Sequence, residues 1–334
     1  MDAIQTSFIN SAQLPFVIEP RNKEISWQEF IQLLSQNVSF FKKQLAHYGG
    51  ILFRGFPVGN ENDFVELIKQ LQLGSFMNYI GGDSPRKKIN EHVYTSTEAP
   101  PSVKIYLHNE LSFVKNYPKY ICFYCATPPE EGGATTLGDA RKIYKAIHPE
   151  VRQRFTSKNL KYISAYYDRS KLMDFINSLQ PAHKPWKHVF ESESRQEVEQ
   201  MCRESEFQFK WLPRGWIQIS QVRPAVMAHP ETGEQVWFNQ AHLFDFNPKH
   251  LGWWRYIAAR LFYWDKETKL HQVSYEDDSK IRSKDLYHVL DTLDGNTIHF
   301  PWKKGDALIL DNVLTMHGRA PFSGKRRILT AMCG

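Results

Sequence analysis

The sequence predicts an α+β fold whose core is a double-stranded β-helix, the jelly roll of cupin-type proteins. Two observations predict it. Many short apolar or alternating runs are separated by turn residues, as in antiparallel β proteins. Helical patterns gather at the start of the chain and between later strands. A jelly roll of this type is open at one end, so side chains from strands that are not neighbours can meet in its mouth.

The N-terminal part is predicted to be mainly helical. Residues 1–25 look irregular or extended, and Ser26 followed by Glu29 has the pattern of a capping box that begins a helix. Gly49 and Gly50 form a stop signal for a second helix. The elements predicted here are a helix from about 27 to 34, a helix at 38–47, a strand at 51–56 and a helix at 61–71.

Short strands dominate the rest of the chain, with turns such as Pro230–Gly233 between them. The predicted strands lie at about 105–110, 119–126, 134–137, 160–167, 211–220, 225–229, 235–238, 297–301, 306–310 and 327–332. The predicted helices lie at about 139–147, 248–264 and 283–292.

One stretch differs in character from its surroundings. Residues 150–210 include a charged, helix-leaning segment, but no Gly/Ser/Pro-rich linker isolates them. The 334 residues are therefore predicted to form a single domain, 1–334, with a helical insertion or lid at about 150–210.

The segment Leu107-His108-Asn109-Glu110 carries the first chemical signal. In a strand, residues two apart point to the same side, so His108 and Glu110 would project together as two ligands of one metal ion. His-x-acid triplets are weak evidence alone, because roughly one or two are expected by chance and three occur. The other two, at His148 and His229, read His-Pro-Glu and belong to a helix end and a turn, so they are interpreted as structural.

A second histidine is needed to complete the 2-His-1-carboxylate set of non-haem Fe(II) oxygenases. The candidate is His317, which follows a predicted strand ending in Asp311-Asn312. Arg327 stands ten residues later, at the start of an apolar strand. A guanidinium pointing into a barrel needs a carboxylate partner, and the distal carboxylate of an iron-chelating 2-oxo acid would provide one.

Composition excludes several classes of protein. The net charge is +6 without a long basic run, so a nucleic-acid partner is not predicted. Four cysteines do not make a disulfide framework, and Cys122 and Cys125 are interpreted as core residues. With no signal peptide and no membrane-length apolar run, we expect a cytoplasmic protein with no membrane partner. The oligomeric state stays open.

From about Tyr48 to Ala331, the chain resembles the TauD/TfdA family of Fe(II)/2-oxoglutarate-dependent dioxygenases, and is most similar to the branch of SyrP-like amino-acid hydroxylases from nonribosomal peptide pathways. The segments that carry the resemblance are Gly49–Phe56, Leu107–Ser112, Gly132–Thr135, Trp237–Gln240 and His317–Leu329.

The resemblance implies residue roles. His108, Glu110 and His317 would bind iron, and Thr135 with Arg327 would hold the distal carboxylate of 2-oxoglutarate. Substrate contacts are less defined. Arg86 could pair with a substrate carboxylate or be an exposed loop residue, and Asn239 could line the mouth of the barrel.

The expected activity is hydroxylation of an unactivated C–H bond of an amino acid or aminoacyl compound, free or tethered to a carrier protein. It would be coupled to decarboxylation of 2-oxoglutarate to succinate and CO2, with Fe(II), 2-oxoglutarate and O2 as cofactors and co-substrates. Halogenating relatives have a small residue in place of the carboxylate, so Glu110 favours hydroxylation. The alternatives are desaturation or cyclisation by the same iron chemistry, and a non-catalytic jelly-roll binding protein.

Overall fold

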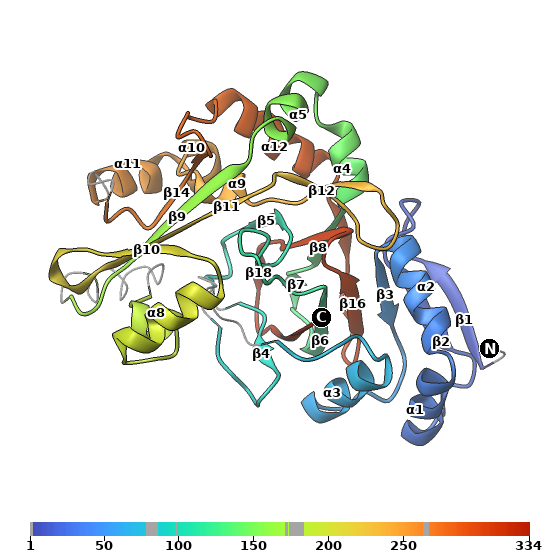
Figure 1. The fold of residues 1–334 in the computed structure, drawn as a ribbon. Helices are drawn as coiled ribbons and strands as arrows, with labels where there is room; N and C mark the ends of the chain where they lie inside the picture. The colour runs from blue at the N-terminus through green and yellow to red at the C-terminus, as the bar shows by residue number, and fades with distance from the viewer. Residues whose placement is uncertain (1–2, 78–85, 98, 171–172, 174–183, 263–266) are drawn as a thin grey trace.

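Two facing β-sheets form the centre of the molecule (Figure 1). The computed structural model describes residues 3–77, 86–97, 99–170, 173, 184–262 and 267–334. The larger sheet has seven strands in the order β1 (Ile4–Phe8), β2 (Phe16–Pro20), β3 (Gly50–Phe53), β16 (Ala307–Asp311), β6 (Tyr120–Thr127), β19 (Arg327–Cys333) and β4 (Tyr94–Thr95). Residues 1–25, predicted as irregular or extended, thus contribute two paired strands.

The smaller sheet carries the predicted metal-ligating histidines. Its order is β15 (Ile298–Phe300), β8 (Thr135–Asp139), β17 (Thr315–Arg319) and β5 (Ile105–His108). A short pair, β7 (Glu131–Gly132) with β18 (Phe322–Ser323), extends from it. Apolar residues of both sheets, among them Leu107, Phe123 and Met316, share one buried core. Two sheets packed face to face around a common core form the predicted jelly roll.

Three N-terminal helices cover the outer face of the large sheet, and a second core lies beneath them (Figure 1). They are α1 (Trp27–Gln36), α2 (Val38–Tyr48) and α3 (Glu61–Gln70). The predicted capping box of α1 is present, with Ser26 and Glu29 exchanging hydrogen bonds. Helix α2 ends at Gly49, whose φ of 79° is the left-handed conformation that glycine adopts most readily.

The predicted insertion contains the strand expected at 160–167 as well as helices. Its described residues include α5 (Pro149–Thr156), α7 (Trp186–Val189) and α8 (Arg195–Glu204), but also two strands. These join a four-stranded sheet in the order β10 (Gln208–Trp211), β11 (Ile217–Arg223), β9 (Leu160–Tyr166) and β14 (His271–Tyr275). Residues 171–172 and 174–183 of the predicted insertion lie outside the described residues.

The strand predicted at 211–220 is divided in the structure. Pro213 begins a 3-10 turn (Pro213–Gly215) that separates β10 from β11, and the two strands pair as a hairpin. The remaining elements are α4 (Ala140–Ala146), β12 (Val226–Ala228), β13 (Gln235–Trp237), α9 (Ala241–Phe244), α10 (Pro248–Leu251), α11 (Trp253–Phe262) and α12 (Ser283–Gly295).

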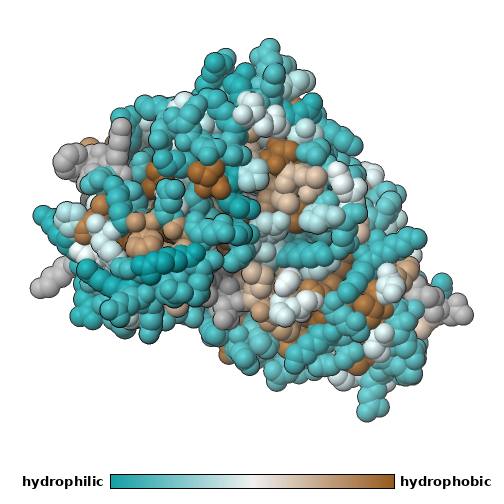
Figure 2. All heavy atoms as spheres, in the orientation of Figure 1, coloured by the Kyte–Doolittle hydropathy of each residue, from teal (hydrophilic) through white to brown (hydrophobic). Residues whose placement is uncertain are grey.

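The surface in Figure 2 is largely hydrophilic, with apolar residues gathered in separate patches. Among the residues described, none of the helices combines the length and apolarity that crossing a bilayer requires.

A buried ion pair joins β3 to the start of β16. Arg54 donates to both carboxylate oxygens of Asp306, at 3.0 and 2.7 Å, and the Asp306 side chain is 1% exposed. We expect Arg54→Leu to lower the free energy of unfolding by about 3–5 kcal/mol, because it leaves a buried carboxylate uncompensated. Urea denaturation measures the loss. The exposed pair of Arg203 and Glu199 is the control, since Arg203→Ala should cost below about 0.5 kcal/mol. A loss below about 1 kcal/mol for Arg54→Leu would contradict the prediction.

Candidate metal centre

The two histidines are brought together by strand pairing. His317 in β17 lies directly opposite His108 in β5 in the antiparallel register, and their ring centroids are 4.4 Å apart. Directly opposed residues of an antiparallel pair project from the same face of the sheet. Segments more than two hundred residues apart in the sequence thus present two imidazoles to one point.

Glu110 reaches the same point from a turn. Strand β5 ends at His108, so the prediction that Glu110 lies on the strand was wrong. The chain leaves the sheet at Asn109, and Leu111 adopts a φ of 53°, an uncommon conformation for a non-glycine residue. The backbone N–H of Glu110 donates to the side chain of Asn312 at 2.7 Å. The turn, rather than strand alternation, therefore directs the carboxylate toward the histidines.

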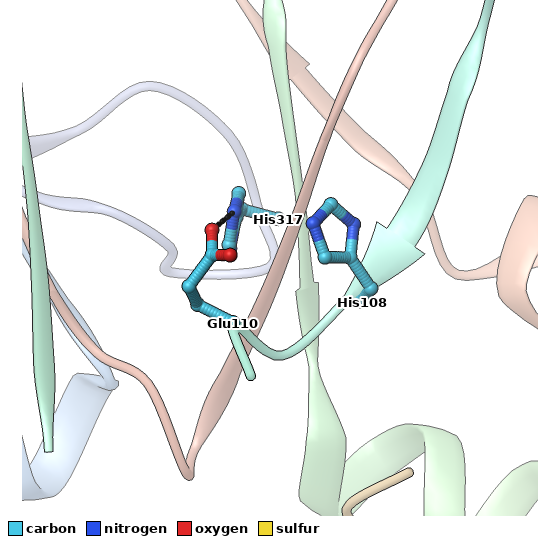
Figure 3. Close-up of side chains that lie close together, drawn as sticks. All are labelled: His108, Glu110 and His317. Carbon is cyan, nitrogen blue, oxygen red and sulfur yellow. Dashed lines mark ion pairs between the residues drawn. The ribbon is translucent and has the colours of Figure 1, made fainter. Parts of the chain in front are cut away.

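The three side chains form a compact cluster (Figure 3). One possible ligand atom from each of His108, Glu110 and His317 lies within 4.8 Å of the others. Nδ1 of His108 is 2.9 Å from the carbonyl oxygen of Tyr106, which leaves Nε2 for a metal ion. Nδ1 of His317 is buried without a hydrogen-bond partner among the described residues. Two imidazoles and one carboxylate with this spacing fit an Fe(II) ion.

Electrostatics keep the cluster in the state that binds a metal. Loss of hydration, helped by the neighbouring His317, lowers the pKa of His108 to about 4, so its ring is neutral at pH 7. Burial opposes ionisation of Glu110, but the Arg86 guanidinium and the two imidazoles outweigh it and hold the pKa of that carboxyl well below its usual range. Neutral imidazole and ionised carboxylate are the ligand forms.

Arg86 lies inside the site rather than on an exposed loop. Its Nη2 donates to Oε2 of Glu110 at 2.6 Å, and the Arg86 side chain is 5% exposed. Arg86 therefore lies beside Glu110, the candidate metal-ligating carboxylate.

A pocket opens beside the histidines, and the predicted Thr135 is part of its wall. Its described lining residues are Arg86, Ser96, Thr97, Ile105, His108, Phe123, Thr135, His317, Gly318, Arg319 and Arg326. The Thr135 oxygen accepts a hydrogen bond from Nε1 of Trp302 at 3.1 Å, so the hydroxyl proton of Thr135 remains free to be donated to a ligand.

Arg326, not the predicted Arg327, reaches this pocket. The Arg326 guanidinium donates to the Gly133 carbonyl at 3.0 Å, and burial lowers its pKa to about 10, which leaves it charged at pH 7. Arg327 is exposed. The cause is side-chain parity along β19, because Ile328 faces the core between the sheets whereas Leu329 faces the helices. Arg326, two residues before Ile328, therefore lies on the pocket side, and Arg327 faces away from it.

The pocket contains a third arginine that sequence reasoning missed. Arg319 lies two residues after His317 and donates to the carbonyls of Ala99, Pro100 and Val103 at 2.6–2.9 Å. The spacing from His317 on one strand was the signal that could have identified it. Arg319 ties the segment that precedes β5 to the strand that carries His317.

Asn239 is not among the described residues that line this pocket. Its Nδ2 donates to the Ala225 carbonyl at 2.8 Å, and its Oδ1 accepts from the Ala241 N–H at 3.1 Å. The amide thus joins the backbone just before β12 to the backbone just after β13. A substrate contact of Asn239 stays a prediction. In the described part of the chain, neither His148 nor His229 belongs to a group of residues that could hold a metal ion.

The jelly roll with a His-Glu-His cluster at its mouth defines the class of protein as a non-haem iron oxygenase. Residues 10–333 match the family described as "Taurine catabolism dioxygenase TauD, TfdA family". The chain belongs to this family and is an iron- and 2-oxoglutarate-dependent dioxygenase, as its sequence resemblance implied. The alternative of a non-catalytic binding protein is set aside.

Several known proteins are similar to this chain. Dapdiamide synthesis protein DdaC of Enterobacter agglomerans is 30% identical, over 86% of this chain and 83% of that protein. Clavaminate synthase-like protein At3g21360 of Arabidopsis thaliana is 27% identical, over 98% of this chain and 96% of that protein. A taurine dioxygenase from Burkholderia xenovorans has a TM-score of 0.55 at 13% identity, covering 99% of this chain and 89% of that structure, and it confirms the predicted fold.

Proposed function

We propose that His108, Glu110 and His317 hold Fe(II), and that 2-oxoglutarate extends from the iron into the adjacent pocket, with its distal carboxylate at Arg326 and Thr135. The observation that carries this proposal is the shared location of the groups. The cross-strand histidines line the same pocket as a buried, charged guanidinium and a hydroxyl with a proton to donate. A guanidinium fork and a hydroxyl together suit a carboxylate.

Iron held there would supply O2 activation coupled to oxidative decarboxylation of 2-oxoglutarate. The residues of the chain have other tasks. Arg326 and Thr135 would orient the co-substrate, and Ile105 and Phe123 form apolar parts of the pocket wall.

The proposed substrate is an amino acid or aminoacyl compound that is hydroxylated at an unactivated C–H bond, either free or tethered to a carrier protein. Arg86 would pair with the carboxylate of this substrate, and its position beside Glu110 in the wall of the same pocket supports this role. The similarity to a protein of dapdiamide synthesis favours a role in secondary metabolism. Desaturation or cyclisation with the same iron chemistry is the second candidate.

Two measurements test the proposal. Anaerobic addition of Fe(II) and 2-oxoglutarate should produce a visible charge-transfer band, and its absence would refute the assigned centre. Incubation with a panel of amino acids, followed by mass detection of a product with one added oxygen atom, should identify the substrate and the outcome. Loss of two hydrogen atoms instead would select desaturation or cyclisation.

The role of Arg86 has its own test. We expect Arg86→Ala to raise the KM for the primary substrate by about 10–100-fold, because a charge-assisted hydrogen bond contributes about 1.5–3 kcal/mol. Arg86→Lys should recover part of the loss, since it keeps the charge but not the planar fork. Steady-state succinate formation at saturating 2-oxoglutarate measures both. An unchanged KM in Arg86→Ala would remove Arg86 from substrate binding.

A further inference from the structure

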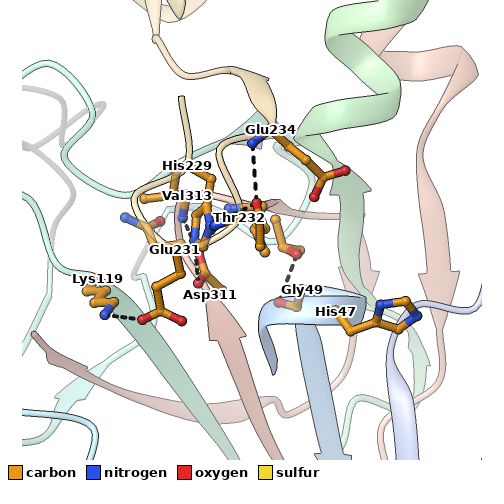
Figure 4. Close-up of polar contacts among 12 residues, drawn as sticks. His47, Gly49, Lys119, His229, Glu231, Thr232, Glu234, Asp311 and Val313 are labelled. Carbon is orange, nitrogen blue, oxygen red and sulfur yellow. Dashed lines mark hydrogen bonds and ion pairs between the residues drawn. The ribbon is translucent and has the colours of Figure 1, made fainter. Parts of the chain in front are cut away.

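A buried hydrogen-bond network lies behind Glu110, outside the pocket. Figure 4 shows the part of it around His229 and Asp311. We propose that Asn312, supported by the His229–Asp311 pair, is a positioning residue that sets the location of Glu110 and thereby the affinity of the centre for its metal ion. The inference rests on the proposed metal site and adds residues that contact neither the metal nor the substrate.

Asn312 binds the main chain of Glu110 at both of its polar groups. The Asn312 side-chain oxygen accepts from the Glu110 N–H at 2.7 Å, and its amide nitrogen donates to the Glu110 carbonyl at 2.9 Å. The same nitrogen donates to the Pro118 carbonyl at 2.8 Å, and Nδ2 of Asn109 donates to the Asn312 carbonyl at 2.5 Å. Asn312 is completely buried.

This side-chain clamp replaces the strand pairing that Glu110 lacks. In the smaller sheet β5 pairs with β17 only as far as His108. Beyond that point Leu111 adopts the left-handed conformation, which costs of order 1–3 kcal/mol and persists only where the surroundings enforce it. The two hydrogen bonds between the Asn312 side chain and the main chain of Glu110 hold Glu110 in place between His108 and Leu111.

Asp311 and His229 orient Asn312. Oδ1 of Asp311 accepts from the N–H groups of Val313 and Leu314 at 2.9 and 3.0 Å, which turns the chain directly after β16. Its other oxygen, Oδ2, lies 3.0 Å from Nε2 of His229. The Thr232 N–H donates to Nδ1 of His229 at 3.1 Å, so Nε2 carries the proton and donates to Asp311.

The His-Pro-Glu turn therefore reaches the metal centre indirectly. His229 is 1% exposed and comes from the β12–β13 turn, and Glu231 of the same turn is fixed to Lys119 by an ion pair of 2.6 Å. His229 contacts Asp311, Asp311 precedes Asn312 in the chain, and Asn312 contacts Glu110. Groups that orient metal ligands in this way are typically worth about 10–100-fold in metal affinity.

The test is titration of metal-free protein with Mn(II) in a calorimeter, which requires no turnover. We expect Asn312→Ala to raise the dissociation constant for Mn(II) by about 10–100-fold. His229→Leu should raise it by a smaller factor, and His229→Gln, which keeps a donor for Asp311, should restore it. Hydrogen exchange of the Glu110 amide should accelerate in Asn312→Ala, because its acceptor is lost.

A matched control separates positioning from general destabilisation. Asp285 of α12 accepts two hydrogen bonds from Arg154 of α5 at 2.8 Å and is equally buried. Asp285→Asn should lower the melting temperature and leave the Mn(II) affinity within about twofold.

The outcomes are distinguishable. If Glu110→Ala loses Mn(II) binding while folded Asn312→Ala keeps it within about twofold, the positioning role is refuted and the proposed metal site stands. If Glu110→Ala itself binds Mn(II) normally, the proposed site fails. Should Asn312→Ala not fold, the His229 variants decide, and equal affinities for His229→Leu and wild type overturn the inference.

Discussion

Glu110→Ala and His317→Ala are each expected to abolish substrate-coupled succinate formation. Each change removes one of the three proposed ligands from a cluster whose ligand atoms lie within 4.8 Å of one another. Residues that only orient ligands are worth about 10–100-fold in metal affinity, so loss of a ligand should exceed about 100-fold. Metal content after dialysis and succinate release in the presence of substrate measure the effect.

The control for these variants is His148→Ala. His148 is the exposed histidine of a His-Pro-Glu triplet and lies at the start of α5, away from the described metal cluster. Its replacement should leave metal content and turnover unchanged. Turnover at the wild-type rate in either Glu110→Ala or His317→Ala would refute the assignment of the centre.

Arg326→Ala is expected to weaken 2-oxoglutarate binding by about 10–100-fold, because hydrogen bonds to a charged group contribute about 1.5–3 kcal/mol. The effect should fall on the KM for 2-oxoglutarate, since the co-substrate keeps its chelating contacts with the iron. Thr135→Val removes one neutral donor and should cost less, about 0.5–1.5 kcal/mol. Titration of the charge-transfer band with 2-oxoglutarate measures the binding directly.

The neighbouring Arg327 provides the matched control. Arg327→Ala makes the same chemical change one position away, at a side chain that is exposed and absent from the pocket wall. We expect its KM for 2-oxoglutarate to stay within about twofold of wild type, as for most surface substitutions. If Arg327→Ala weakens binding and Arg326→Ala does not, the side-chain parity assigned to β19 is wrong.

The choice between Arg326 and Arg327 could not be made from the sequence. Spacing from His317 located the start of the last strand, but it could not decide which of two adjacent arginines faces inward. Parity depends on the apolar pattern of the whole strand and on a register shift in the pairing of β19 with β6 between Arg327 and Ile328. The burial of Ile328 against one core and Leu329 against the other settles the direction.

The candidate metal ligands, in contrast, could be predicted from the sequence. Spacing and the family resemblance identified His108, Glu110 and His317 as the candidate set, and the structure brings all three together. The reason given for Glu110 was nevertheless wrong, because the strand ends before it. Its placement depends on Asn312, about two hundred residues away, and a non-local hydrogen bond of this kind leaves no local periodicity to read.

Asn312 binds the main chain of residue 110 and not its side chain. The side chain at position 110, which would face the iron, can therefore be replaced without changing the course of the loop. The side chain at position 110 and the course of the loop are in this sense set independently. A variant with a small residue at position 110 keeps its two histidines on paired strands and gains a vacant coordination position. Added formate or halide could occupy that position, so chemical complementation of Glu110→Ala by small anions offers a route to new reactivity on an unchanged scaffold.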